Sequence, residues 1–462
     1  MSSKHTTLSL VNLSGVDISS VDVSNVDAYD WDYSPPERTK PYRPDLNFTG
    51  PLASGDARCE REEINARANG VNFTLTCRFA DGSRLEIPVD QGDALAKQDG
   101  IYGRATSSGA AGRNVYRVTG QDKETHTQAF YLYPKALPDH SDWMGRLLRN
   151  KPGVLLNHIT MPGSHDAGMY VDNSDDVKLN AAQNGGGEWA LTQHLPMRDQ
   201  LRAGARYFDI RVYHDRNGVL WTYHGQFKGA VFYGAFGGKL TEILGDVKAF
   251  LDGPGASEAV FLKITPYDGA ADLPKTIGEI RAKLASHLYT AAHDPSFAVT
   301  RLADLKGKVV VAFDPLFHGL LDPNQGLFPY RECGNEDGTL RQVTGGGLKV
   351  YDVYADSNSF EHMKRDQDKK LTAHGGHGKS YLFLLSWTVT GETGGILDLE
   401  LLSRCANPQL PRKLRALARG NKLPNIVHLD HLDAYLCGAI IALNDPVLAV
   451  APPSPGGAPV VA

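Results

Sequence analysis

The sequence lacks any apolar run of about 18 residues, so no membrane-spanning helix is expected. Residues 1–20 contain no charged segment followed by an apolar core, so the sequence predicts no classical signal peptide. We therefore expect either a cytoplasmic protein or one that reaches its site by non-classical export. The sequence does not decide between these two locations.

Positive charge and cysteine are also scarce. The net charge of −5 at pH 7 provides no basic field for nucleic acid, so we expect no nucleic-acid partner. Five scattered cysteines are too few for a disulfide scaffold, and their odd number favours mostly free thiols. A bond between Cys59 and Cys77 stays open. No Cys-x-x-Cys or His-x-x-x-His pattern predicts a zinc site.

The 462 residues are enough for a catalytic barrel and a smaller domain. Residues 1–50 are polar, with repeated Val-Asp pairs, and are predicted to form an extended arm. Residues 51–137 alternate apolar and polar side chains around Asp81-Gly82, a turn typical of β-hairpins. They predict a small sandwich-like β domain of unknown role. Residues 138–448 would form the large domain, and the Pro/Gly-rich residues 449–462 a disordered tail.

Short apolar runs alternate with helical patterns in the large domain. We expect strands at residues 154–161, 207–213, 259–265, 309–313, 348–353, 382–387 and 426–429. Apolar residues at helical spacing lie between them, as in Leu240, Ile243, Leu244 and Val247. This alternation predicts an α/β fold with a TIM-type (β/α) barrel, either complete or distorted. The absence of Gly-x-Gly-x-x-Gly after the first strand argues against a dinucleotide-binding fold.

Polar residues lie in or just after each of these runs. In an α/β barrel, functional groups lie at the carboxyl ends of the strands. One such residue is more often a helix cap or a satisfied core group, but a series over consecutive strands favours a site. The series is His165, Asp166, Asp209, Arg211, His224, Lys263, Asp314, Asp352, Tyr354, Ser386, Trp387 and Asp430.

Three of these segments resemble a known family. Residues 161–166, 204–211 and 223–225 are similar, in order and spacing, to the X-domain signature of phosphatidylinositol-specific phospholipases C. Residues 348–354 and 424–430 resemble later barrel strands of that family. The resemblance covers about residues 140 to 445 and points to the bacterial, metal-independent branch. It implies a phosphodiesterase in which a substrate hydroxyl attacks the neighbouring phosphodiester.

The resemblance implies roles for two histidines. His165 would be the general base, oriented by Asp430, and His224 the general acid, hydrogen-bonded to Asp166. Histidine suits both roles because its reference pKa of about 6.5 lets it accept or donate a proton near neutrality. A carboxylate behind each ring would fix its tautomer. Adjacent side chains on an extended backbone point apart, so His165 and Asp166 are expected to serve different partners.

The resemblance also implies a site without metal. Arg211, held by Asp209, would bind the phosphoryl oxygens with its planar guanidinium. The eukaryotic branch has Asn in place of Asp166 and binds calcium through carboxylates. Arg211 stands where a metal-binding acid would be needed, and a guanidinium beside a divalent cation is electrostatically unfavourable. We therefore expect no cofactor, and calcium is disfavoured.

Headgroup contacts follow from the same resemblance. Lys263, Asp352 and Tyr354 match headgroup-binding positions of the bacterial family. Trp387 would either stack on a sugar-like ring or close the barrel as a core residue, and both interpretations stay open. Where the family has an arginine on its fourth strand, this chain has Asp314, which leaves inositol specificity open.

The expected substrate is a phospholipid or an inositol phosphate, reached by peripheral contact with a membrane. One alternative is a metal-dependent glycerophosphodiesterase or a barrel like that of sphingomyelinase D, against which the missing acidic metal cluster argues. Another is a non-catalytic module that binds lipid or carbohydrate, against which the intact histidines and their partners argue. The sequence predicts neither the natural substrate nor the oligomeric state.

Overall fold

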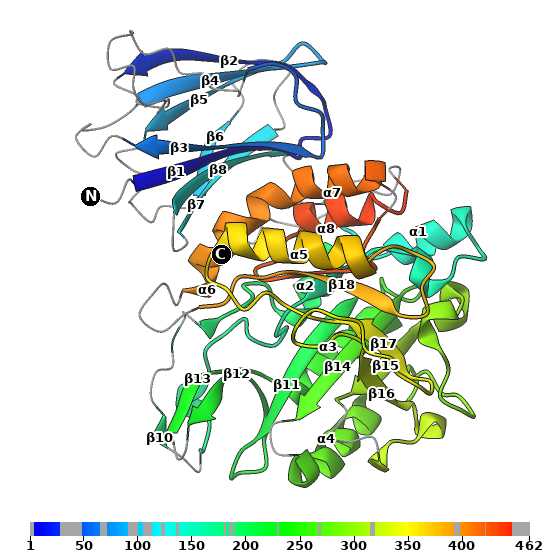
Figure 1. Cartoon of the computed structure of the whole chain (residues 1–462). Helices are drawn as coiled ribbons and strands as arrows, with labels where there is room; N and C mark the ends of the chain where they lie inside the picture. Colours follow the sequence, from blue (N-terminus) through cyan, green and yellow to red (C-terminus); the bar gives the residue numbers. More distant parts are fainter. Residues whose placement is uncertain are drawn as a thin grey trace.

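The computed structural model describes residues 4–27, 49–64, 72–90, 100–104, 113–121, 125–134, 138–179, 182–183, 187, 190–228, 231–266, 269–314, 319–391, 398–420 and 422–445. They form an N-terminal β domain and a larger barrel domain, which lie against each other (Figure 1). The predicted disordered tail, residues 449–462, lies outside the described residues. None of the described helices combines the length and apolar character needed to cross a bilayer.

Parallel strands close into the barrel that the sequence predicts. The strands are β9 (Met161–Ser164), β11 (Tyr207–His214), β14 (Ala259–Pro266), β15 (Lys308–Phe313), β16 (Leu327–Glu332), β17 (Leu348–Tyr351), β18 (Leu382–Trp387) and β19 (Ile426–Leu429). Each pairs in parallel with the next, and β19 pairs with β9, where Ile426 lies opposite Met161. The ring is therefore complete, and the TIM-type fold class is confirmed.

Two expectations about strands were wrong. Residues 154–160 are not a strand, because Leu156–His158 form a short 3-10 helix, η3, and the first barrel strand begins only at Met161. Leu156 and Ile159 are fully buried in the barrel core, and an apolar run alone does not distinguish a strand from a buried turn. The strand β16 was missed because Pro329 interrupts its pattern, and proline demotes a run as a strand candidate.

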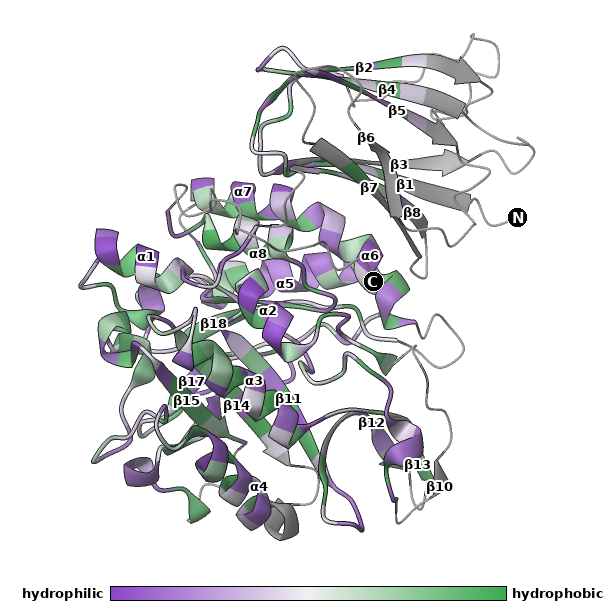
Figure 2. Ribbon diagram, turned by 180° about the vertical axis from the view of Figure 1, so that it is seen from behind, coloured by the Kyte–Doolittle hydropathy of each residue, from purple (hydrophilic) through white to green (hydrophobic). Residues whose placement is uncertain are grey.

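Helices surround the barrel: α1 (Trp143–Asn150), α2 (Met197–Ala203), α3 (Leu240–Asp252), α4 (Gly269–Leu284), α5 (Phe360–His374), α6 (Leu399–Ala406), α7 (Leu410–Gly420) and α8 (Ala434–Ile441). The predicted apolar stripe of α3 is buried in one hydrophobic cluster with barrel residues such as Phe208 and Ile210. Figure 2 shows hydrophobic barrel strands and hydrophilic residues on the helices around them.

The alternation of side chains along β11 positions the site. Phe208 and Ile210 belong to the cluster between the strands and the helices, whereas Tyr207 belongs to the cluster inside the barrel. Successive side chains of a strand point to opposite faces, so Asp209 and Arg211 point inward with Tyr207. Two further strands, β12 (Leu220–Lys228) and β13 (Val231–Lys239), extend the sheet beyond β11, together with β10 (Ala182–Gln183).

The N-terminal domain is built from two sheets with a shared core. One has the order β3-β1-β8-β7-β6 and the other β2-β4-β5. The strands are β1 (Lys4–Asn12), β2 (Ile18–Asp27), β3 (Asp56–Ile64), β4 (Asn72–Phe79), β5 (Arg84–Asp90), β6 (Gly100–Arg104), β7 (Arg113–Gln121) and β8 (Thr125–Pro134). Leu10 and Phe130 of the first sheet pack in one cluster with Val21 and Leu75 of the second. This packing is that of a β-sandwich.

The polar arm predicted for residues 1–50 was wrong for residues 4–27, which are the strands β1 and β2. The Val-Asp pairs that suggested an arm are the alternation of a half-buried strand, with Val21 inside the core. The hairpin at Asp81-Gly82 is confirmed, since β4 and β5 pair and Gly82 adopts a φ of +83°. Cys59 and Cys77 form no disulfide bond, and each of the five cysteines is a thiol.

Candidate active site

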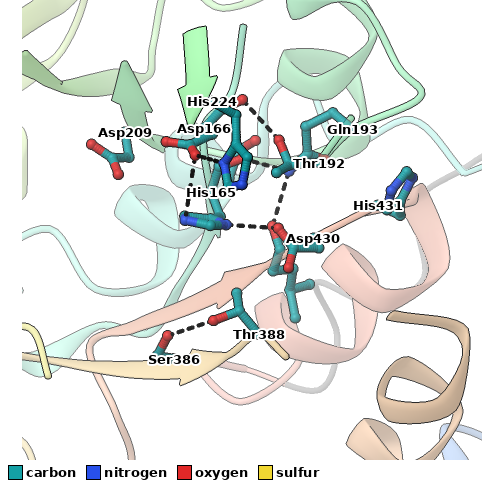
Figure 3. A network of polar contacts seen from close by, with 12 residues as sticks. His165, Asp166, Thr192, Gln193, Asp209, His224, Ser386, Thr388, Asp430 and His431 are labelled. Carbon is teal, nitrogen blue, oxygen red and sulfur yellow. Dashed lines mark hydrogen bonds and ion pairs between the residues drawn. The ribbon is translucent and has the colours of Figure 1, made fainter. Parts of the chain in front are cut away.

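The structure brings two histidine–carboxylate pairs together where β9, β11 and β19 end (Figure 3). His165 Nδ1 lies 2.7 Å from Asp430 Oδ1, and His224 Nδ1 lies 2.5 Å from Asp166 Oδ2. The two imidazole rings are 6.2 Å apart and almost perpendicular, at 87°. Because each Nδ1 faces a carboxylate, each ring has its Nε2 left for another partner.

Asp166 adopts a left-handed φ of 39°, a conformation that Asp tolerates better than most residues. Its carboxylate is buried and contacts two side chains: Oδ2 accepts from His224, and Oδ1 lies 2.8 Å from Arg211 Nε. Burial raises the pKa of Asp166, but Arg211 and the two histidines outweigh it and hold that pKa well below its usual range. Asp166 is therefore a fixed negative charge at the centre of the site.

His165 lies between two carboxylates. Besides Asp430, its ring has Asp166 nearby, with Nε2 3.7 Å from Asp166 Oδ2. Burial lowers the pKa of His165, but Asp166 and Asp430 outweigh it and raise the pKa to about 9. The surrounding loop is fixed by Gln193, whose amide donates to the backbone carbonyls of His165 and Leu429 at 2.9 and 3.0 Å. Sequence reasoning missed Gln193, because it lies in a loop without a pattern of its own.

Arg211 differs from the prediction in its partner. Its Nε is 3.9 Å from Asp209 but 2.8 Å from Asp166, so Asp166 holds it more closely than the predicted Asp209 does. Asp209 is buried and lies 3.8 Å from Lys263 Nζ. Asp209 thus stands between the two cations of the site.

A second group of polar residues lies next to these. Lys263 Nζ is 3.0 Å from Asp352 Oδ2, and the hydroxyl of Tyr330 donates to the same oxygen at 2.8 Å. Burial lowers the pKa of Lys263, but Asp209 and Asp352 raise it well above its usual value. Tyr354 is 55% exposed. Tyr330 was not predicted as a site residue, because its strand, β16, was not recognised in the sequence.

Two residues from the predicted series lie apart from these groups. The side chain of Trp387 is buried outside the ring of strands, where Nε1 donates to the Ala406 carbonyl at 3.0 Å and the ring packs on Phe360. The proposed stacking of Trp387 on a substrate ring is therefore wrong, and its core role is confirmed. Asp314 is half-buried after β15, where its backbone N–H donates to Ile264.

A third histidine, His428, lies next to His165. Its ring is inside the barrel, with its centroid 5.3 Å from that of His165 and 5.6 Å from that of Tyr207. Burial, reinforced by the neighbouring charge of His165, lowers the pKa of His428 to about 4. Its Nε2 is buried and has no hydrogen-bond partner among the described residues. A neutral ring therefore lies against the charged His165.

One group of described residues has the donor atoms for a metal ion. Ligand atoms of His165, Asp166 and Asp209 lie within 4.8 Å of one another. Arg211, however, already neutralises Asp166 at 2.8 Å and approaches Asp209 at 3.9 Å. A divalent cation at these carboxylates would lie against the guanidinium, which is electrostatically unfavourable.

Part of the chain is similar to known proteins. No family model matches the chain. It is 31% identical to mouse PI-PLC X domain-containing protein 2 over 128 residues, which are 24% of this chain and 35% of that protein. It is 27% identical to the 1-phosphatidylinositol phosphodiesterase of Staphylococcus aureus strain Newman over 225 residues, 46% of this chain and 64% of that protein. These matches confirm the resemblance to the phosphatidylinositol-specific phospholipase C X-domain family.

The matched segments span about a third of the mouse protein and less than two thirds of the staphylococcal one. Among solved structures, a phosphatidylinositol-specific phospholipase C from Staphylococcus aureus superposes with a TM-score of 0.49 at 19% identity, covering 66% of this chain and 98% of that chain. The assignment of the barrel rests on the strand pairing of this chain itself.

Proposed function

We propose that this chain is a phosphoric diester hydrolase or lyase of the phosphatidylinositol-specific phospholipase C type, and that it works without metal. The observation that carries the proposal is the pair of imidazoles, each with a buried carboxylate on Nδ1, together with the contact of Arg211 with one of these carboxylates, Asp166. Intramolecular transesterification requires one group that accepts a proton, a second group that donates one, and a cation that binds the phosphate. The two histidines and Arg211 supply these groups.

In this proposal a hydroxyl of the substrate attacks the adjacent phosphorus. His165 Nε2 takes the hydroxyl proton as the new O–P bond forms. The bond from phosphorus to the leaving alcohol breaks, and His224 Nε2 donates a proton to that oxygen. Arg211 stabilises the charge on the non-bridging oxygens. The products are a cyclic phosphodiester and the free alcohol, and water opens the cyclic product when the two histidines exchange roles.

Binding of the remainder of the substrate is assigned to the second polar group. Lys263, Asp352 and Tyr354 offer donors and acceptors for the hydroxyls of a polyol headgroup. The name of the staphylococcal relative supports phosphatidylinositol as the substrate class. A lipid substrate implies contact with a membrane surface.

The test is phosphorus NMR of the products formed from phosphatidylinositol vesicles in the presence of EDTA. We expect a cyclic phosphate, and each of His165→Ala and His224→Ala to reduce the rate by about 10²–10⁴-fold. The exposed His293 gives a matched control, His293→Ala, that keeps full activity. Full activity in the two site variants, or phosphatidic acid as product, would contradict the proposal. Loss of activity in EDTA would favour a metal-dependent phosphodiesterase instead.

A further inference from the structure

A pocket of about 490 Å³ lies between the N-terminal domain and helix α7, and none of the residues assigned to the candidate active site lines it. Pro51, Leu52, Asp56, Ala57 and Arg58 line it from the N-terminal domain, and Arg412, Arg415, Ala416 and Arg419 from α7. Figure 1 shows α7 directly beneath the sheet that contains β1 and β3. Two domains thus contribute to one concave surface.

The lining of this pocket is strongly basic. It contains four arginines and one aspartate, a net charge of +3. Arg412, Arg415 and Arg419 are spaced three and four residues apart, so they share one face of α7. The whole chain has a net charge of −5, so this concentration of cations does not follow from composition.

Contacts between the domains explain only part of this charge. Arg415 donates to the Ser54 carbonyl and lies 3.8 Å from Asp56, so it joins the domains. The charge of Arg419 is stabilised by the helix dipole, because Arg419 lies at the C-terminal end of α7. In the part of the chain that the structure describes, Arg412 and Arg419 have no carboxylate partner. The positive charges of these arginines repel one another, and the contacts between the domains do not explain why Arg412 and Arg419 are present.

Arg58 is already oriented at the other wall. Its Nη1 and Nη2 donate to the carbonyls of Thr49 and Pro51 at 2.8 and 2.7 Å. These contacts fix the plane of the guanidinium and lower the entropy that binding an anion would cost. Arg412 and Arg419 are about 10 Å apart along the axis of α7, given the rise of an α-helix. The cations are therefore spread over more than the width of a single phosphate.

We infer that this pocket binds a ligand with two or more phosphate groups, held by Arg58, Arg412 and Arg419. Arginine binds phosphate oxygens in pairs through its planar fork, and the volume accommodates a small phosphorylated headgroup. The ligand would be the headgroup of a polyphosphorylated lipid or a soluble molecule of the same chemistry. This site lies outside the proposed catalytic groups and would link the two domains through the ligand.

The test uses the full chain and isothermal titration with inorganic pyrophosphate at 0.15 M salt, where surface charge is screened beyond roughly 8 Å. The variant is Arg412→Gln/Arg419→Gln. The matched control is Arg365→Gln/Lys369→Gln, which removes two exposed cations from α5. We expect at least about a tenfold loss of pyrophosphate affinity in the α7 variant, from the loss of two charge-assisted contacts. The control should bind as the wild type does.

A second arm separates the two sources of the ligand. Vesicles of phosphatidylcholine, with and without a few per cent of a phosphoinositide bisphosphate, are sedimented with the protein. Binding to the bisphosphate vesicles that pyrophosphate reverses indicates a lipid headgroup, whereas pyrophosphate binding without vesicle binding indicates a soluble ligand. The inference is overturned if pyrophosphate fails to bind the wild type, or binds both variants equally well. Circular dichroism of both variants checks that they are folded.

Discussion

At the scale of single residues, His165 differs from an isolated imidazole because two carboxylates flank it. Asp430 contacts its Nδ1 at 2.7 Å, and Asp166 lies 3.7 Å from its Nε2. Burial alone would lower the pKa of His165, yet these charges raise it to about 9. The protonated ring is therefore favoured at neutral pH, whereas a general base must be neutral to accept a proton.

This opposition predicts the pH dependence of the proposed reaction. The rate constant kcat/KM should rise as the pH increases towards about 9, because only deprotonated His165 accepts the hydroxyl proton. Asp430→Asn removes one carboxylate that raises this pKa, so the rise should move to lower pH by about one unit or more. The maximal rate should also fall, since Nδ1 loses the partner that fixes the tautomer. A pH–rate profile on a soluble phosphodiester measures both effects, and an unmoved rise in Asp430→Asn would contradict the assignment.

The two histidine–carboxylate pairs could be predicted because short motifs of the sequence resemble those of a known family, and that resemblance implied the pairing. Trp387 was not, because every residue of β18 is buried and the run shows no alternation. The direction of the Trp387 side chain follows from the alternation along the strand. Leu382 and Leu384 pack inside the barrel, so the odd-numbered Trp387 points outward. Nothing in the sequence indicated that the ring of His428 points into the barrel, because this orientation depends on the register of β19 against β9.

At the scale of elements, a buried ion pair joins the segments that precede β11 and β14. Arg206 Nη2 lies 2.7 Å from Glu258 Oε2, and both side chains are fully buried. Arg206 also donates to the carbonyls of His140, Ser141 and Leu201, while Glu258 accepts from the backbone of α1. The pair therefore ties α1 and α2 to two barrel strands.

We expect Glu258→Ala to lower the free energy of unfolding by about 3–5 kcal/mol, since it leaves the Arg206 charge buried without its partner. Urea denaturation followed by tryptophan fluorescence measures the loss. Glu242→Ala, which removes a largely exposed carboxylate from α3, should change the stability by less than about 0.5 kcal/mol. Equal effects of the two substitutions would show that the buried pair contributes no more to the free energy of unfolding than an exposed carboxylate does.

At the scale of the whole molecule, the N-terminal sandwich lies on the side of the barrel formed by α6, α7 and α8 (Figures 1 and 2). Tyr133 of β8 packs on Tyr435 of α8 with ring centroids 5.0 Å apart. Asp433 caps α8 through the backbone of Tyr435 and Leu436, three residues after Asp430. The docking surface and the candidate site thus share one stretch of chain.

The docking of the two domains could not be predicted from the sequence. The alternation in residues 51–137 predicted a β domain, yet nothing in it indicated which face would dock. The contacts join residues far apart in the chain, such as Arg415 with Asp56, and each side is an ordinary surface residue when considered alone. Local patterns specify elements, whereas docking depends on which surfaces meet after both domains have formed.

The tyrosine pair permits a test of how firmly the domains are joined. The hydroxyl of Tyr435 is buried without a hydrogen-bond partner among the described residues, so Tyr435→Phe keeps the ring contact and should leave stability almost unchanged. Tyr435→Ala removes the ring and should weaken docking by about 2 kcal/mol or more, as loss of an interface aromatic does. Differential scanning calorimetry should show one transition for the wild type and Tyr435→Phe, and two for Tyr435→Ala as the sandwich and barrel unfold separately. A single unshifted transition in Tyr435→Ala would mean that the domains are held together elsewhere, with Arg415 at the arginine-lined pocket as the next contact to substitute.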